Sequence, residues 1–219
     1  MRLPPYDLAM FEQLFGGVVA AALGLSLAAS CGLRAFLPLL VLGVAGRVGG
    51  DSLNLIQGEA FEWIKSTPAL IALSVAVVVE VLADKVPALD HLLDVIQAPV
   101  RTGAGMLAAA AVAGHLPMWA TATLALIAGG GALSVHAGKS ALRVGSTATT
   151  AGTANPLISI AEDIACLGLS VLSILLGAAV VCLALFVLVA LIFVFVKWRA
   201  RRAARKELAE ENQAPPETG

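Results

Sequence analysis

Long apolar runs, separated by short polar segments, occupy most of the 219 residues of the chain. Hydrophobic residues make up 59% of it and charged residues 13%, about half the charged fraction of an ordinary soluble domain. A helix of about 20 apolar residues crosses the hydrocarbon core of a bilayer, so the runs predict an all-α, polytopic transmembrane helical bundle of about six spans. The runs are 16–46, 67–84, 95–114, 117–145, 156–177 and 178–197.

Polar flanks bound this transmembrane domain, which we place at residues 16–198. Residues 1–15 are expected to form an N-terminal cytoplasmic segment, and residues 199–219 a disordered cytoplasmic tail that is first basic and then acidic. The positive-inside rule then predicts a multi-pass protein of the cell inner membrane with both termini cytoplasmic. Residues 157–197 allow two interpretations: a tight hairpin at Gly177, which we favour, or one long tilted helix. The bases assigned to the inner side are Arg2, Lys85, Arg101, Lys139, Arg143 and those of the tail.

Two connecting segments predict helices that lie on the membrane surface. In 51–66, apolar residues recur at helical spacing opposite acidic ones, and Trp63 would lie at the headgroups of the outer face. In 86–97, an apolar and an acidic stripe follow Pro87, which suits the first turn of a helix on the inner face. The segment 145–155 is rich in Ser, Thr and Gly, and is interpreted as an ordinary connector or, alternatively, a mobile gate.

The first and fourth runs share features that predict a 3+3 inverted repeat with interrupted helices. Both are over-long, and each is interrupted, by Gly32 and Pro38 in the first and by the glycines 129–131 in the fourth. Each is followed by a helix with acidic residues. Broken helices in inverted repeats recur in transporters, and chance similarity among small apolar residues is the alternative explanation. The many Gly and Ala residues of 95–114 predict close packing against neighbouring helices or against a second copy in a homodimer.

Ionisable residues inside the apolar runs are the first candidates for a binding site. A charge at the bilayer centre costs about 2.5–3.5 kcal/mol on insertion scales, so these side chains are expected to face the bundle interior and to pair. Ser26, Ser30 and Arg34 recur every four residues and share one face of the first helix. Glu80 and Asp84 are also four apart, and pairing with Arg34 or with bases of the fourth run would offset their desolvation.

The fourth run has a basic edge whose natural counterpart is acidic. His136, Lys139 and Arg143 are spaced three and four apart and lead toward the cytoplasm. Glu162 and Asp163 would open the fifth helix, where the positive end of the helix dipole favours carboxylates. Part of this acidity is therefore attributable to helix capping, and the rest is available to pair with the basic edge.

Other classes of function have less support in the residues. Asp90, His91 and Asp94 are weak candidates for a divalent-metal site, because carboxylates with one imidazole suit magnesium, manganese or zinc. The same residues also fit the polar face of a surface helix, and the chain has neither a His-Glu-x-x-His motif nor a nucleophile elbow. We expect neither enzymatic activity nor a cofactor. The formal net charge of −1 and the few aromatic residues argue against nucleic-acid binding.

Three stretches together resemble a known family. They are GLSLAASCGLRAFLPLL at 24–40, EVLADKVPALDHLLD at 80–94 and SIAED at 159–163. They are similar to the bacterial membrane family known as domain of unknown function 4126, over about residues 18–197, and the acid-rich stretch 80–94 is the most specific element. The resemblance implies an integral inner-membrane protein, and it brings no established substrate or activity.

Two functions are consistent with these residues. The first is a small transporter or channel for an unidentified ion or small anionic solute. Glu80 and Glu162 would bind a proton or cation, while Arg34, Lys139 and Arg143 would neutralise these carboxylates or hold an anionic solute. The alternative is a non-transporting membrane scaffold or assembly factor whose intramembrane charges are structural ion pairs. The expected partners are the lipid bilayer and, for a transporter, the solute.

Overall fold

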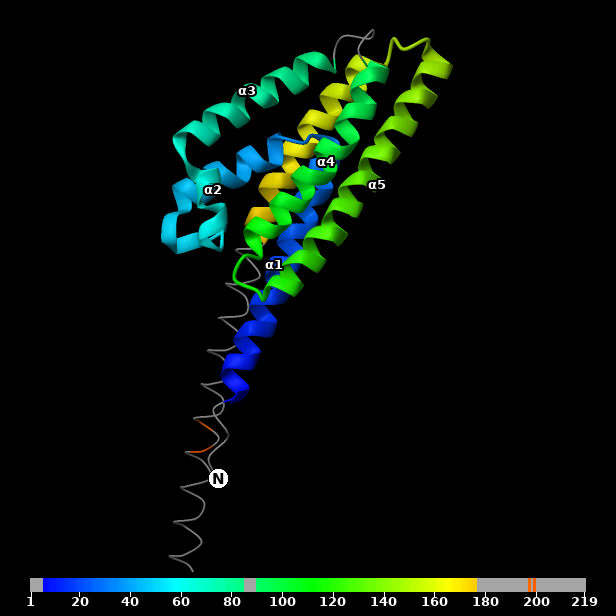
Figure 1. The fold of residues 1–219 in the computed structure, drawn as a ribbon. Coiled ribbons are helices and arrows are strands. Elements are labelled where there is room, and N and C mark those ends of the chain that lie inside the picture. The colour runs from blue at the N-terminus through cyan, green and yellow to red at the C-terminus, as the bar shows by residue number, and fades with distance from the viewer. Residues whose placement is uncertain (1–5, 85–89, 177–196, 198, 200–219) are drawn as a thin grey trace, which may run out of the picture. The chain divides into compact units, whose positions relative to one another are not determined.

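The computed structural model of the chain describes residues 6–84, 90–176, 197 and 199, and in these residues it contains helices and no strand. The chain divides into two compact units, residues 1–178 and residues 179–219, and every helix discussed below belongs to the first unit. The all-α prediction is confirmed for the described residues. The helices are α1 (Tyr6–Leu33), α2 (Leu37–Leu53), the 3-10 helix η1 (Glu59–Lys65), α3 (Thr67–Ala83), α4 (Asp90–Val112), α5 (Met118–Thr150) and a further helix, Asn155–Leu176, called here the 155–176 helix (Figure 1).

Within the described residues, three helices are long and apolar enough to cross a membrane: α1 from Leu14 onward, α5, and the 155–176 helix. The pair η1 and α3, bent by 62°, is a fourth if it is counted as one span. Large apolar side chains such as Ile71, Val75 and Leu157 are exposed on these helices, whereas Arg34 and other charged side chains are buried. Apolar residues outside and charges inside are the pattern of a protein surrounded by lipid, so the fold indicates a membrane protein.

Small residues let α1, α4 and α5 pack closely side by side (Figure 1). A Cβ atom at Gly24 of α1 would lie 3.1 Å from the Cα of Ala109, and one at Gly105 of α4 would lie 2.8 Å from the Cβ of Ala132. Helix backbones come this close only where the residues at the contact have small side chains or none. The close packing predicted for 95–114 is thus confirmed within the chain, and the homodimer stays a prediction.

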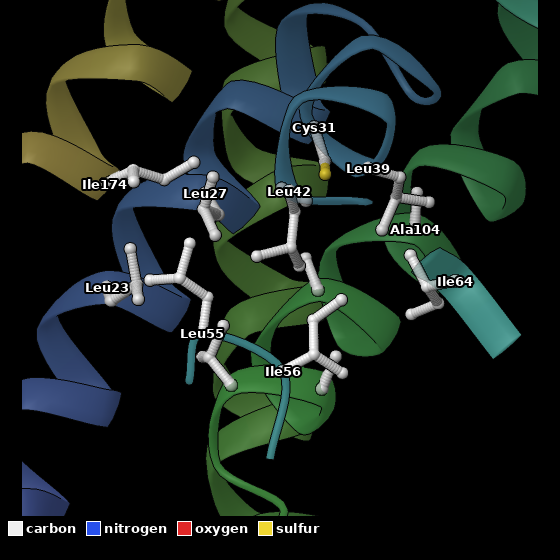
Figure 2. Packing of buried hydrophobic residues seen from close by; sticks show 14 of the residues in the cluster. Leu23, Leu27, Cys31, Leu39, Leu42, Leu55, Ile56, Ile64, Ala104 and Ile174 are labelled. Atoms are coloured by element: carbon white, nitrogen blue, oxygen red, sulfur yellow. The ribbon is translucent and has the colours of Figure 1, made fainter. Parts of the chain in front are cut away.

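An apolar cluster joins this bundle to α2 and to the segment between α2 and α3 (Figure 2). Ile56 and Ile64 belong to it and are 2% and 1% exposed. The surface helix predicted at 51–66 is therefore wrong: α2 ends at Leu53, a turn follows, and only η1 is helical. The turn depends on Gly58, whose φ of +103° disfavours any other residue. Of the apolar side chains expected at the lipid headgroups, the turn buries Ile56, whereas Leu53 and Trp63 are exposed.

The first apolar run does not cross the bundle once, as was predicted for 16–46, but returns to the side from which it starts. A Cβ atom at Gly16 in α1 would lie 3.4 Å from the ring of His115, in the turn between α4 and α5. After α2, the N–H of Gln57 donates to the carbonyl of Ala111 at 2.8 Å, at the end of α4 next to the same turn. α1 and α2 therefore form a helix-break-helix unit, with both ends on one side.

α5 is unbroken from Met118 to Thr150, so the interruption predicted at 129–131 is wrong. One of these glycines serves helix packing. A Cβ atom at Gly129 would lie 2.6 Å from the Cγ of Met106 on α4, whereas one at Gly130 or Gly131 would meet nothing within 4 Å. The connector predicted at 145–155 is also shorter than expected. Its first six residues are helical, and the turn that links α5 to the 155–176 helix covers only residues 151–154.

The other predicted segments agree with the observed helices to different degrees. α3 matches the run 67–84 within one residue. The separate surface helix predicted at 86–97 is wrong over its described part, because α4 runs from Asp90 through Pro99 without a break. A proline removes one backbone donor, and here the helix continues past it. The run 178–197, and with it the hairpin at Gly177, lies outside the described residues.

Adding a methyl group at Gly32 is expected to destabilise the fold. The new Cβ atom would lie 2.5 Å from the carbonyl oxygen of Ala132 and 2.6 Å from the Cβ of Val135, both on α5. We expect Gly32→Ala to lower the free energy of unfolding by about 1–3 kcal/mol, measured as a lower melting temperature in detergent.

Gly131→Ala is the matched control, since a Cβ atom there meets nothing within 4 Å. Alanine in an exposed helix position is expected to stabilise this variant by about 0.5–1 kcal/mol. Equal melting temperatures for the two variants would contradict the contact between α1 and α5.

Candidate functional site

α1 ends at Leu33 and α2 begins at Leu37, and the three residues between them form the α1–α2 break. Pro38 explains the position of the break, because a proline ring clashes with the carbonyl four residues earlier, which here belongs to Arg34. The interruption predicted at Pro38 is confirmed, whereas Gly32 lies within α1. A break among apolar helices leaves backbone N–H and C=O groups that need partners other than water.

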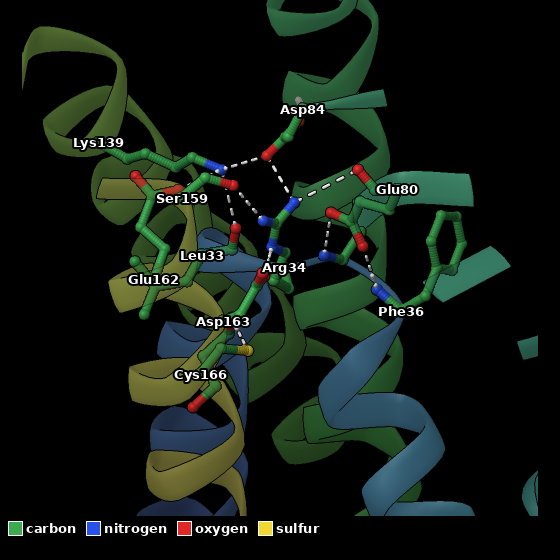
Figure 3. Close-up of polar contacts among 12 residues, drawn as sticks. Leu33, Arg34, Phe36, Glu80, Asp84, Lys139, Ser159, Glu162, Asp163 and Cys166 are labelled. Atoms are coloured by element: carbon green, nitrogen blue, oxygen red, sulfur yellow. Dashed lines mark hydrogen bonds and ion pairs between the residues drawn. The ribbon is translucent and has the colours of Figure 1, made fainter. Parts of the chain in front are cut away.

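Glu80 of α3 satisfies the N–H groups on the α2 side of the break (Figure 3). One carboxylate oxygen accepts from the N–H of Ala35 at 2.8 Å and the other from the N–H of Phe36 at 3.3 Å. A carboxylate at this end also interacts favourably with the partial positive charge of a helix N-terminus. Glu80, which is 6% exposed, therefore acts as a side-chain cap for α2.

Arg101 of α4 satisfies the carbonyl groups on the α1 side. Its guanidinium donates to the carbonyl oxygens of Gly32, at 2.8 Å, and of Leu33, and it lies 3.3 Å from a carboxylate oxygen of Glu80. Lys139 of α5 also donates to the carbonyl of Leu33, at 3.2 Å. Cations at the negative end of α1 and a carboxylate at the positive end of α2 thus match the two helix dipoles.

Three cations converge on a single oxygen of Asp84, the residue that follows α3. Its Oδ2 lies 2.5 Å from Nη1 of Arg34, 3.1 Å from Nζ of Lys139 and 3.1 Å from Nη2 of Arg143. Three positive charges at these distances offset the desolvation of one buried carboxylate.

The 155–176 helix adds two further carboxylates to the same place. Oε2 of Glu162 lies 3.1 Å from Nζ of Lys139 and 3.0 Å from Nη2 of Arg143, while Oδ1 of Asp163 lies 2.5 Å from Nε of Arg34. The prediction that Glu162 and Asp163 open the helix is wrong, because the helix begins at Asn155, two turns earlier. They pair with cations of other elements instead of capping their own helix.

The charged residues of these contacts form what we call the ion cluster. It contains four cations and four carboxylates, so its formal net charge is zero. The side chains are at most 10% exposed, apart from that of Asp163 at 24%. Charges held in an apolar bundle need this degree of pairing to offset their desolvation. The members are Arg34, Glu80, Asp84, Arg101, Lys139, Arg143, Glu162 and Asp163.

The other sequence candidates are Ser26, Ser30 and His136. The hydroxyl of Ser26 donates to the carbonyl of Leu23, and that of Ser30 to the carbonyl of Ser26, so both bond within α1. His136 is buried on α5, one turn before Lys139. The face predicted for Ser30 and Arg34 does point into the protein, since both are fully buried.

The structure brings in two residues that the sequence analysis did not select. Arg101 was assigned to the inner boundary, yet it is the twelfth of the 23 residues of α4 and is fully buried. Its place in the middle of an apolar run was the signal that could have identified it. Ser159 accepts a hydrogen bond from Arg34 at 3.0 Å. It precedes Asp163 by four residues, so the two share one helix face.

No metal centre emerges from the part of the chain that the structure describes. No group of three or more His, Cys, Asp or Glu residues there is arranged to hold a metal ion. The weak candidates Asp90, His91 and Asp94 begin α4, but their side chains lie outside the described part. They stay a prediction.

Comparison with known proteins identifies the same family that the sequence resembles. The model of the family described as a domain of unknown function (DUF4126) matches residues 21–197. The match covers most of the chain and includes every member of the ion cluster. Neither a curated protein nor a solved structure matches the chain.

Removing one partner of the pair Glu80 and Arg101 is expected to destabilise the fold strongly. Arg101→Gln would leave a buried carboxylate without its cation and the carbonyls of the α1–α2 break with a weaker donor. We expect a loss of about 3–5 kcal/mol in the free energy of unfolding, measured by thermal unfolding in detergent. Lys65→Gln, which breaks the exposed pair with Glu62, is the control and should cost at most about 1 kcal/mol.

A double variant separates the buried charge from other effects of the substitution. Glu80→Gln together with Arg101→Gln removes the unpaired carboxylate, so part of the stability lost in Arg101→Gln should return. A double variant that is no more stable than Arg101→Gln would contradict the pairing.

Proposed function

Since the chain belongs to the DUF4126 family, a domain of unknown function, its role has to come from its own residues, and we propose that it is a small transporter or channel for an ion or small anionic solute. The solute would bind at the ion cluster. The observation that carries the proposal is the α1–α2 break, where two helix ends and eight charged side chains meet among apolar helices. Binding sites of this construction, with broken helices at mid-membrane depth, recur in transporters.

The burial of the ion cluster supports this role. Arg101 is fully buried on α4, and α4 packs along α1 and α5, both of which are candidate spans. A charge buried inside a spanning bundle marks a pathway for ions or protons more often than a surface feature. In the proposal, Arg34, Lys139 and Arg143 bind the anionic group of the solute. The carboxylates of Asp84 and Glu162 pair with these cations when no solute is bound.

The proposal includes a topology. η1 with α3, then α4, α5 and the 155–176 helix would each cross the membrane, and the α1–α2 unit would enter and return on one side. The run 178–197 would add a further crossing. Six crossings, the inverted repeat and an inner-membrane location with cytoplasmic termini stay predictions. Three of the bases assigned to the inner side, Arg101, Lys139 and Arg143, are buried in the ion cluster and do not act as loop charges.

One observation favours the alternative, a scaffold or assembly factor without transport. The formal charge of the ion cluster is zero, so every cation has a carboxylate and the fold needs no solute to neutralise it. In this alternative the ion pairs only hold the α1–α2 break and the surrounding helices together. The two proposals differ in whether any solute crosses a membrane that contains the protein.

Flux into liposomes that contain the purified protein tests the proposal. We expect the protein to move at least one solute from a panel of protons, common inorganic ions and phosphate. Arg34→Gln should reduce the flux by at least about tenfold, because it removes about 1.4 kcal/mol or more of charged hydrogen bonding to the solute. Size-exclusion profiles of the variant would show that it is folded.

Arg47→Gln is the matched control, since Arg47 is exposed and is not a member of the ion cluster. Its guanidinium donates to the hydroxyl of Thr67 at 2.9 Å. This variant should transport as well as the unmodified chain. If no solute of the panel moves in the unmodified protein, transport is rejected and the scaffold alternative stands.

A further inference from the structure

Asp84 occupies a position that is built for an anion. Arg34 reaches its Oδ2 from the α1–α2 break, and Lys139 and Arg143 reach the same atom from α5, at 2.5, 3.1 and 3.1 Å (Figure 3 shows the first two). Neutralising one carboxylate needs one cation, whereas three converge here on one oxygen. Such a convergence of guanidinium and ammonium groups is the usual chemistry for binding an oxyanion.

Charge counting shows what the site would be without the Asp84 carboxylate. Of the three cations, Arg34 would keep Asp163, and Lys139 with Arg143 would keep Glu162. Among these five side chains, three positive charges and two negative charges would remain, which is a surplus of one positive charge. A surplus of this size is neutralised by one monovalent anion.

The Asp84 carboxylate can be withdrawn from the three cations without moving the helices that carry them. Asp84 follows the last residue of α3, while the three cations belong to α5 and the α1–α2 break. A different rotamer of the Asp84 side chain would move its carboxylate away from the cations while Glu80 keeps its bonds to the break. The weak bond that the other oxygen accepts from Gln97, at 3.4 Å, would be lost in this movement.

We propose that the carboxylate of Asp84 is an internal substitute for the solute, and that a small monovalent oxyanion binds between Arg34, Lys139 and Arg143 by displacing it. The inference rests on the proposed function for its role, because it names the class of solute for the same site. The hydroxyl of Ser159, 3.0 Å from Arg34, provides a further polar group beside the anion. The structure, in which the Asp84 carboxylate occupies the anion position, is then the state without solute.

Formate is the probe for this inference, because it has the size and charge of the side-chain group of Asp84. Melting temperatures of the purified full chain in detergent are measured against sodium formate, with sodium gluconate at equal ionic strength as the reference. In Asp84→Ala the site is vacated, and the half-saturating formate concentration is expected to be at least about tenfold lower than in the unmodified chain. Asp84→Asn keeps the size of the side chain, loses the attraction to the cations, and should shift in the same direction.

Two controls connect the response to the three cations. Glu62→Ala removes an exposed carboxylate that pairs with Lys65. The melting temperature of this variant should respond to formate as that of the unmodified chain does. Adding Lys139→Gln to Asp84→Ala removes the surplus positive charge, so the gain in formate affinity should disappear. A general effect of formate on solvent would raise all melting temperatures alike.

The outcomes separate this inference from the proposed function, since the formate measurement needs no transport. If neither Asp84 variant gains formate affinity over the unmodified chain, or if Glu62→Ala gains as much, the inference is overturned even when the protein moves a solute. If the formate response is found but no solute crosses the liposome membrane, the inference stands and the transport proposal is rejected.

Discussion

The polar backbone of the α1–α2 break must be satisfied inside a bundle of apolar helices, and the arrangement of the charged residues follows from this requirement. Buried N–H and C=O groups that bulk water does not reach need partners from the protein itself. Glu80 therefore binds the N–H groups of Ala35 and Phe36, and Arg101 binds carbonyls at the end of α1. Each of these charges then needs a partner of its own, so the requirement spreads from the break to α3 and α4.

The same requirement connects the remaining helices. Arg34 belongs to the break itself, and it brings in Asp84 at the end of α3 and Asp163 on the 155–176 helix. Lys139 links α5 to both Asp84 and Glu162. The result is a neutral cluster that joins elements distant in sequence, and it makes the positions of α3 and the 155–176 helix depend on electrostatics as well as on apolar packing.

Much of the site could be predicted from the sequence, because charges inside apolar runs are rare and must pair. The pairing of the basic edge of α5 with acidic residues, and the break at Pro38, both followed from residue type and spacing. The role of Arg101 could not be predicted in this way, because the positive-inside rule already explained its presence as a base on the inner side of the membrane. Glycines were also ambiguous: Gly129 lets α4 approach α5, whereas the run 129–131 was expected to break the helix. The return of the α1–α2 unit depends on long-range contacts, such as that of Gln57 with Ala111, which no local pattern encodes.

Ion pairs between separate helices hold the buried break, and a double-mutant cycle on Asp84 and Lys139 measures one of these pairs directly. The free energy of unfolding in detergent would be determined for Asp84→Asn, for Lys139→Gln and for the double variant. Direct contact predicts a coupling energy of about 0.5–3 kcal/mol, with the double variant more stable than the sum of the single losses implies. Additive losses, with a coupling energy near zero, would contradict the ion cluster.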